Sequence, residues 1–64
     1  MKLKEYYSKK VNILASNGTT YSGTVNDYFF PDDNDHGMES IVLETLSGDL
    51  VEFTELDIKT ITTI

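Results

Sequence analysis

The sequence lacks several residue types that small proteins use to fix their structure or to perform chemistry. Its 64 residues include no cysteine, no tryptophan, no arginine, one histidine and one proline. Without cysteine there are no disulfides and no cysteine-based zinc sites. No apolar run approaches the roughly 18 residues that a membrane span needs, and the first ten residues lack the apolar segment of a signal peptide. We therefore expect a cytoplasmic protein without membrane contact or cofactor.

The short length limits the chain to one domain and one small core. A chain of this size buries only about 60% of the surface that its unfolded form exposes, which leaves little material for an enclosed active site. His36 is the only histidine, and no serine lies in a nucleophile elbow. The loop 31–37 does not match the calcium-binding EF-hand pattern. We predict a single domain, residues 1–64, that is not an enzyme and holds no metal.

The charges are distributed unevenly along the chain. The net charge is -6, but the first ten residues carry four lysines against one glutamate, whereas residues 11–64 carry one lysine against ten carboxylates. The body of the domain is therefore at -9. Because affinity for nucleic acids comes mostly from cations that neutralise phosphates, this balance disfavours RNA or DNA as a partner.

Five segments have the composition of β-strands. They cover about residues 9–15, 19–30, 38–46, 50–53 and 58–64. In the first segment Val11, Ile13 and Ala15 alternate with more polar residues, which predicts one buried face. Gly23 lies inside the second segment, where a glycine favours a sharp bend of the strand.

The connections between these segments are short. Asn17–Gly18 predicts a type I′ hairpin turn, with positive φ at both residues. Residues 55–57 are too few for an α-helix and predict a 3₁₀ turn. At the amino terminus, Leu3 to Tyr7 predict one helical turn that covers an open end of the sheet.

These elements together predict an all-β fold, a small five-stranded SH3-like barrel that is partly open and has a short N-terminal helical turn. A flat meander of three to five strands is the alternative, although it would leave one apolar face in water.

The segment from Val11 to Asp27, with its Asn17–Gly18 turn, Tyr21, Gly23 and Val25, resembles the first motif of the Sm-like family. The likeness continues in Met38 with residues 41–44 and in residues 53–61, so it covers about residues 9–62. It is also similar to short Sm-like proteins of Gram-positive bacteria and phages. The resemblance implies a bent five-stranded barrel that assembles into rings and binds RNA. However, the RNA-contacting Asn and Arg-Gly of the family are replaced by Glu39–Ser40 and Thr54–Glu55.

Adjacent aromatic residues and the positions that correspond to the family's RNA site predict an interaction surface. Side chains alternate between the two faces of a strand, so at least one of the three aromatic residues from 28 to 30 should be exposed. The candidate surface comprises Tyr28, Phe29, Phe30, His36, Met38, Glu39, Ser40 and Thr54.

We expect a non-enzymatic interaction module that binds a protein or assembles with itself through strand edges. A weak or specialised RNA-binding protein is the alternative. The candidate edge for self-association comprises Leu50, Val51, Phe53, Ile58, Thr60 and Ile61. The last strand contains one lysine, no proline and three isoleucines, a composition that favours pairing with a neighbour.

Overall fold

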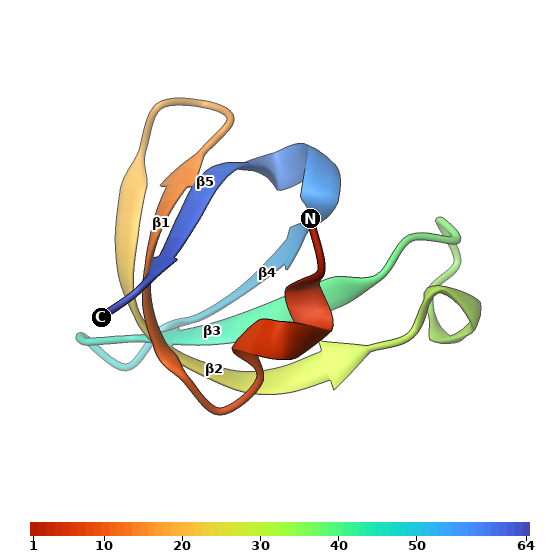
Figure 1. The fold of residues 1–64 in the computed structure, drawn as a ribbon, viewed down its shortest axis with the longest axis horizontal. Coiled ribbons are helices and arrows are strands. Elements are labelled where there is room, and N and C mark those ends of the chain that lie inside the picture. Colours follow the sequence, from red (N-terminus) through yellow and green to blue (C-terminus); the bar gives the residue numbers. More distant parts are fainter.

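The computed structural model describes residues 1–64 and consists of one antiparallel sheet with three short 3₁₀ turns (Figure 1). The strands are β1 (Lys10–Ala15), β2 (Thr20–Phe29), β3 (Ser40–Thr45), β4 (Leu50–Thr54) and β5 (Ile58–Thr63). The turns are η1 (Leu3–Tyr6), η2 (Pro31–Asp33) and η3 (Glu55–Asp57). The prediction of an all-β fold with five strands is confirmed, and so are the turns at the N-terminus and before the last strand.

The core lies on one face of the curved sheet, as the alternating pattern of β1 predicted. Val11, Ile13 and Ala15 are buried, while their neighbours along the strand are not. β2 and β3 add Val25, Ile41 and Leu43 to the same cluster, and Phe53, Ile58 and Leu3 complete it. Nine apolar side chains thus form the whole buried core of the domain.

Strand β2 changes partner along its length and so bends the sheet. Its first half pairs with β1 and its second half with β3, and both pairings include Gly23. A Cβ atom at Gly23 would collide with the carbonyl oxygen of Glu44 and come within 2.9 Å of the Thr45 Cα. The glycine is therefore required because the β3 backbone passes directly over it, a close approach that no other residue permits.

The two tight hairpins have the same turn, and it is not the predicted one. Gly18 has a φ of +90° and Gly48 a φ of +92°, but Asn17 is not in the left-handed region. The Gly18 N–H donates to the Ala15 carbonyl and the Ala15 N–H to the Thr19 carbonyl. This pattern belongs to a three-residue loop in which a type I turn is followed by a left-handed glycine. The type I′ prediction is wrong because Ser16 joins the loop, so only the glycine needs positive φ.

The N-terminal turn η1 covers one end of the core. The Leu3 side chain is completely buried, and Tyr6 packs against the core from outside. Figure 1 shows η1 lying across the sheet near β2 and β3, which matches the contacts of this turn with both strands. No helix in the structure has the length and apolarity to span a membrane.

The sheet is not closed. Its strand order is β4-β3-β2-β1-β5, so β4 and β5 are its two edges and have no hydrogen-bonded neighbour on their outer sides. In Figure 1 the sheet curves so that β1 and β5 run steeply across the view, while β3 and the second half of β2 run nearly horizontally. The two edges therefore belong to the two ends of one strongly bent sheet.

Candidate interaction surfaces

A bulge in β2 determines where its aromatic side chains point. The register between β2 and β3 shifts between Val25 and Asp27, so Asn26 is the extra residue. Before the bulge the odd-numbered residues face the core, and after it Tyr28 pairs with the buried Ile41 and packs against the core. A bulge often redirects a side chain in this way. As a result Tyr28 and Phe30 share the side of the sheet on which η1 lies.

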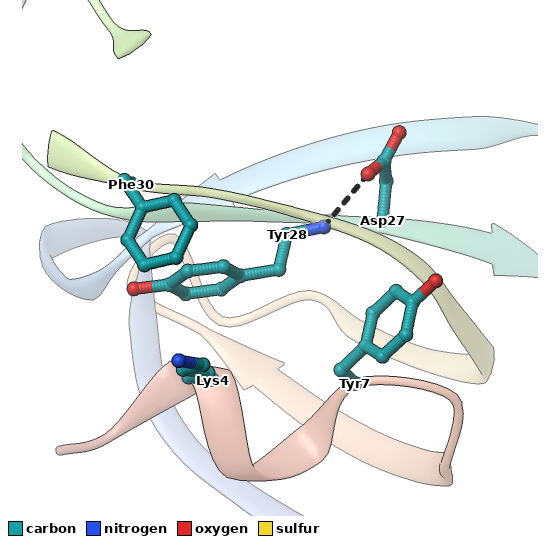
Figure 2. Close-up of a pocket in the computed structure, with 5 residues that line it drawn as sticks. All are labelled: Lys4, Tyr7, Asp27, Tyr28 and Phe30. Atoms are coloured by element: carbon teal, nitrogen blue, oxygen red, sulfur yellow. Dashed lines mark hydrogen bonds between the residues drawn. The ribbon is translucent and has the colours of Figure 1, made fainter. Parts of the chain in front are cut away.

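Five residues from η1, its C-terminal flank and the end of β2 enclose an open cavity of about 290 Å³, lined by Lys4, Tyr7, Asp27, Tyr28 and Phe30, which we call the aromatic cleft (Figure 2). The Tyr28 and Phe30 ring centroids are 5.2 Å apart at an interplanar angle of 85°, an edge-to-face contact that aromatic pairs favour. The Lys4 Nζ lies 5.1 Å from the centroid of the Phe30 ring. Phe30 is still 51% exposed and Tyr7 53% exposed.

Glu39 connects the N-terminal turn to the sheet. Its Oε1 accepts a hydrogen bond of 2.8 Å from the Leu3 N–H, and its Oε2 accepts one of 3.0 Å from the Tyr28 hydroxyl. Burial raises the pKa of Tyr28, and the hydrogen bond to Glu39 and the negative charges of Glu39 and Glu55 raise it further. The tyrosine thus remains a neutral hydrogen-bond donor well into the alkaline range.

The loop between β2 and β3 is fixed by side chains. The Asn34 side-chain amide donates to the Met38 carbonyl at 2.8 Å and to the Ser40 Oγ at 3.1 Å. The Met38 N–H donates to the His36 Nδ1 at 3.1 Å. Since Ser40 is completely buried, Asn34 ties the loop to the start of β3.

The structure brings together only part of the predicted interaction surface. Tyr28 contacts both Phe30 and Glu39, at the aromatic cleft and beside it. Phe30 is the exposed one of the three aromatic residues, but it lies just after the end of β2 on the same side as Tyr28, so the alternation of the strand does not account for its exposure. Ser40 and Thr54 pair with each other across β3 and β4 and are both buried, which removes them from the accessible surface.

The remaining predicted residues lie elsewhere. Phe29 pairs with Ser40 and therefore lies on the opposite face of the sheet from Tyr28. His36 and Met38 belong to the loop beyond β2 and are held to each other. None of these three residues lines the aromatic cleft.

Lys4, Tyr7 and Asp27 were missed by the sequence-based prediction of this surface. Lys4 and Tyr7 are three residues apart, a spacing that places two side chains on one side of a helical turn. This spacing was readable in the sequence, but the docking of η1 beside the end of β2 was not.

The outer side of β4 presents unpaired backbone groups. The Thr45 N–H donates to the Asp49 carbonyl at 2.8 Å. Given the register of β3 and β4, the backbone N–H groups of Val51 and Phe53 therefore point toward β3. Because backbone groups alternate along an antiparallel strand, Leu50 and Glu52 point their N–H groups away from the sheet. The Thr54 N–H already donates to the Asp57 Oδ2 at 2.9 Å.

The outer side of β5 presents a similar row. The Ile64 N–H donates to the Lys10 carbonyl at 2.9 Å. Given the register between β1 and β5, the backbone N–H groups of Thr62 and Thr60 also point toward β1. Ile61 and Thr63 consequently direct their N–H groups outward.

The residues of the predicted oligomer edge lie on the two edge strands, but their side chains differ in exposure. Phe53 and Ile58 are in the buried core, so only their backbones lie at an edge. Val51 and Ile61 are half-buried, whereas Leu50 and Thr60 are exposed. A neighbouring chain would therefore meet mainly backbone groups together with a few exposed side chains.

No group of three or more histidine, cysteine, aspartate or glutamate side chains is arranged to hold a metal ion. A comparison of the chain with family models, with curated proteins and with solved structures finds no significant match. The candidate surfaces are thus defined by the geometry of this chain alone.

Proposed function

We propose that this protein is a small, non-enzymatic interaction module of the Sm-like class that assembles with copies of itself through β4 of one chain and β5 of the next. The observation that carries this proposal is the open sheet, in which both edge strands have free backbone donors on their outer sides. Exposed edges of this kind are templates for pairing with another chain.

The Sm-like class is supported by the resemblance over residues 9–62 together with several features of the fold. The five-stranded antiparallel sheet has Gly23 where β2 passes from pairing with β1 to pairing with β3, a 3₁₀ turn precedes the last strand, and an N-terminal turn covers one end of the core. These features agree with those that the sequence predicted for a partly open SH3-like barrel.

Pairing between two different edges has a geometric consequence. A contact of β4 with β5 is head-to-tail, so each added chain presents a new free edge and the assembly closes into a ring or continues as a filament. Each chain carries a net charge of -6, and this repulsion limits the strength of the contact.

The acidic body argues against RNA binding, which is the alternative function, because few cations are present to neutralise phosphates. RNA binding is tested by measuring the affinity of the protein for labelled U-rich, A-rich and mixed oligonucleotides at low and moderate salt. Micromolar or tighter binding that survives moderate salt would overturn the proposed ranking, because contacts from the N-terminal lysines alone weaken steeply with salt.

The direct test of self-assembly is sedimentation at several protein concentrations. We expect species heavier than the 7.2 kDa chain whose population grows with concentration. A single species of 7.2 kDa at all concentrations, in both low and high salt, would contradict the proposal.

A further inference from the structure

The aromatic cleft combines two properties that attract cations. Its aromatic rings are accessible, since Phe30 and Tyr7 each expose about half of their surface. The negative face of an aromatic ring attracts an ammonium or guanidinium group within about 6 Å of its centroid. The cavity beside these rings, about 290 Å³, is open to solvent.

The surroundings of the cleft are acidic. Asp27 lines it, Glu39 lies next to it, and the charge of Glu55 also acts on Tyr28. Asp32 and Asp33 follow Phe30 after Pro31, in η2. Residues 11–64 carry a net charge of -9 and the first ten residues, which supply η1, carry +3, so the sheet side of the cleft favours a cationic ligand over an anionic one.

The protein already places a cation here. The Lys4 ammonium lies 5.1 Å from the Phe30 ring centroid, and it comes from the basic first ten residues of the chain. Its own turn is held by other contacts, namely the buried Leu3 side chain and the hydrogen bond from the Leu3 N–H to Glu39. Because Lys4 is exposed, its side chain can leave the ring while η1 stays in place.

We propose that the aromatic cleft binds a lysine or arginine side chain of a basic partner segment, which takes the position over Phe30 that Lys4 holds in the free protein. None of the five residues that line the cleft belongs to β4 or β5. This inference is therefore independent of self-assembly, and the two can fail separately.

The test measures binding of a synthetic peptide that contains several lysines separated by glycine and serine and ends in tryptophan. Because the protein contains no tryptophan, fluorescence of the peptide reports binding without interference. A matched peptide with glutamate in place of each lysine is the control. We expect the lysine peptide to bind and the glutamate peptide not to bind.

Two variants distinguish the ring site from general attraction to an acidic surface. Lys4→Gln removes the resident ammonium and should tighten peptide binding about 3- to 10-fold. Lys2→Gln makes the same change of charge at an exposed position that does not line the cleft, and should change binding less than about 2-fold.

Phe30→Leu keeps an apolar side chain but removes the ring, and should weaken binding several-fold in a protein that still unfolds cooperatively. Four outcomes would each overturn the proposal. Two concern the lysines: Lys4→Gln binds the lysine peptide more weakly, or Lys4→Gln and Lys2→Gln have equal effects. The others are that Phe30→Leu binds with native affinity, or that the native protein prefers the glutamate peptide.

Discussion

The two edge strands of the sheet differ in charge and in the backbone groups they leave free. β4 carries Glu52, and its last outward N–H, that of Thr54, is already bonded to Asp57. β5 carries Lys59 and no carboxylate. Its outward N–H groups, at Ile61 and Thr63, have no hydrogen-bond acceptor of the kind that Asp57 provides for Thr54. Like charges that face each other across strands are unfavourable and opposite charges are favourable. The difference favours pairing of β4 with β5 over pairing of either edge with itself.

The largest expected effect comes from Gly23, which sets the bend that separates the two edges. Gly23→Val places a side chain against the Glu44 carbonyl and should lower the free energy of unfolding by about 3 kcal/mol. Urea denaturation measures the change. Ser22→Val, at the neighbouring position of β2, is the control and should cost far less. Equal losses for the two variants would show that the backbone over Gly23 gives way and that the bend does not depend on the glycine.

A smaller loss of stability is expected from Asp57, which caps the end of β4. The Asp57 carboxylate accepts hydrogen bonds from the Thr54 N–H at 2.9 Å and from the Thr54 hydroxyl at 3.1 Å. The Thr54 side chain in turn accepts from the Asp57 N–H, which completes a capping box at η3. Asp57→Ala should cost about 1 kcal/mol of stability in thermal or urea unfolding. It also frees the Thr54 N–H and makes the β4 edge more like the β5 edge. Glu55→Ala in the same turn is the control, and an equal loss there would argue against the cap.

Salt should change assembly because the attraction at the edges competes with repulsion between acidic bodies. Each chain carries -6, and raising sodium chloride from about 0.05 to 0.5 M screens most of this long-range repulsion. We expect the association constant from sedimentation to increase about 3- to 10-fold. A decrease with salt would mean that the attraction between Glu52 and Lys59 outweighs the net charge.

The smallest expected effect is a pH-dependent change of stability that involves Tyr28, which belongs to neither edge strand. Its pKa is raised in the folded state, so its contribution to stability is complete below the unfolded value of about 10 and is lost as pH rises through the folded value. Tyr28→Phe should therefore be less stable than the native protein at pH 8, and the gap should shrink above pH 10. Thermal midpoints between pH 8 and 11.5 test this, with Tyr7→Phe as the control. A gap that stays constant would rule out the role of the Tyr28 hydroxyl.

The strands could be predicted from the sequence because local patterns determine them. The alternation of Val11, Ile13 and Ala15 identified the buried face of β1. Connections that contain a glycine marked most of the boundaries between one strand and the next. The bulge at Asn26 could not be predicted, because it arises from the register of β2 against β3. For that reason the sequence indicated that one of the aromatic residues would be exposed, but not which one.

The composition of the aromatic cleft depends on tertiary contacts in the same way. Tyr28 and Phe30 were recognised as candidates from their position at a strand end, whereas Lys4 joins them only because Leu3 docks into the core. The unpaired edges were predicted from composition and strand count. Which N–H groups point outward follows only from the register.

Mixing two blocked variants tests the central claim, that β4 of one chain pairs with β5 of another. Glu52→Pro removes an outward donor from β4, and Thr63→Pro removes one from β5, at edge positions that tolerate proline. Glu52→Gln and Thr63→Ser, which keep the donors, are the controls and should assemble. We expect each proline variant alone to sediment as the 7.2 kDa chain, and a mixture to form a complex of two chains and nothing larger. A proline variant that still dimerises alone, or a mixture that stays at 7.2 kDa while the controls assemble, would contradict pairing between the two edges.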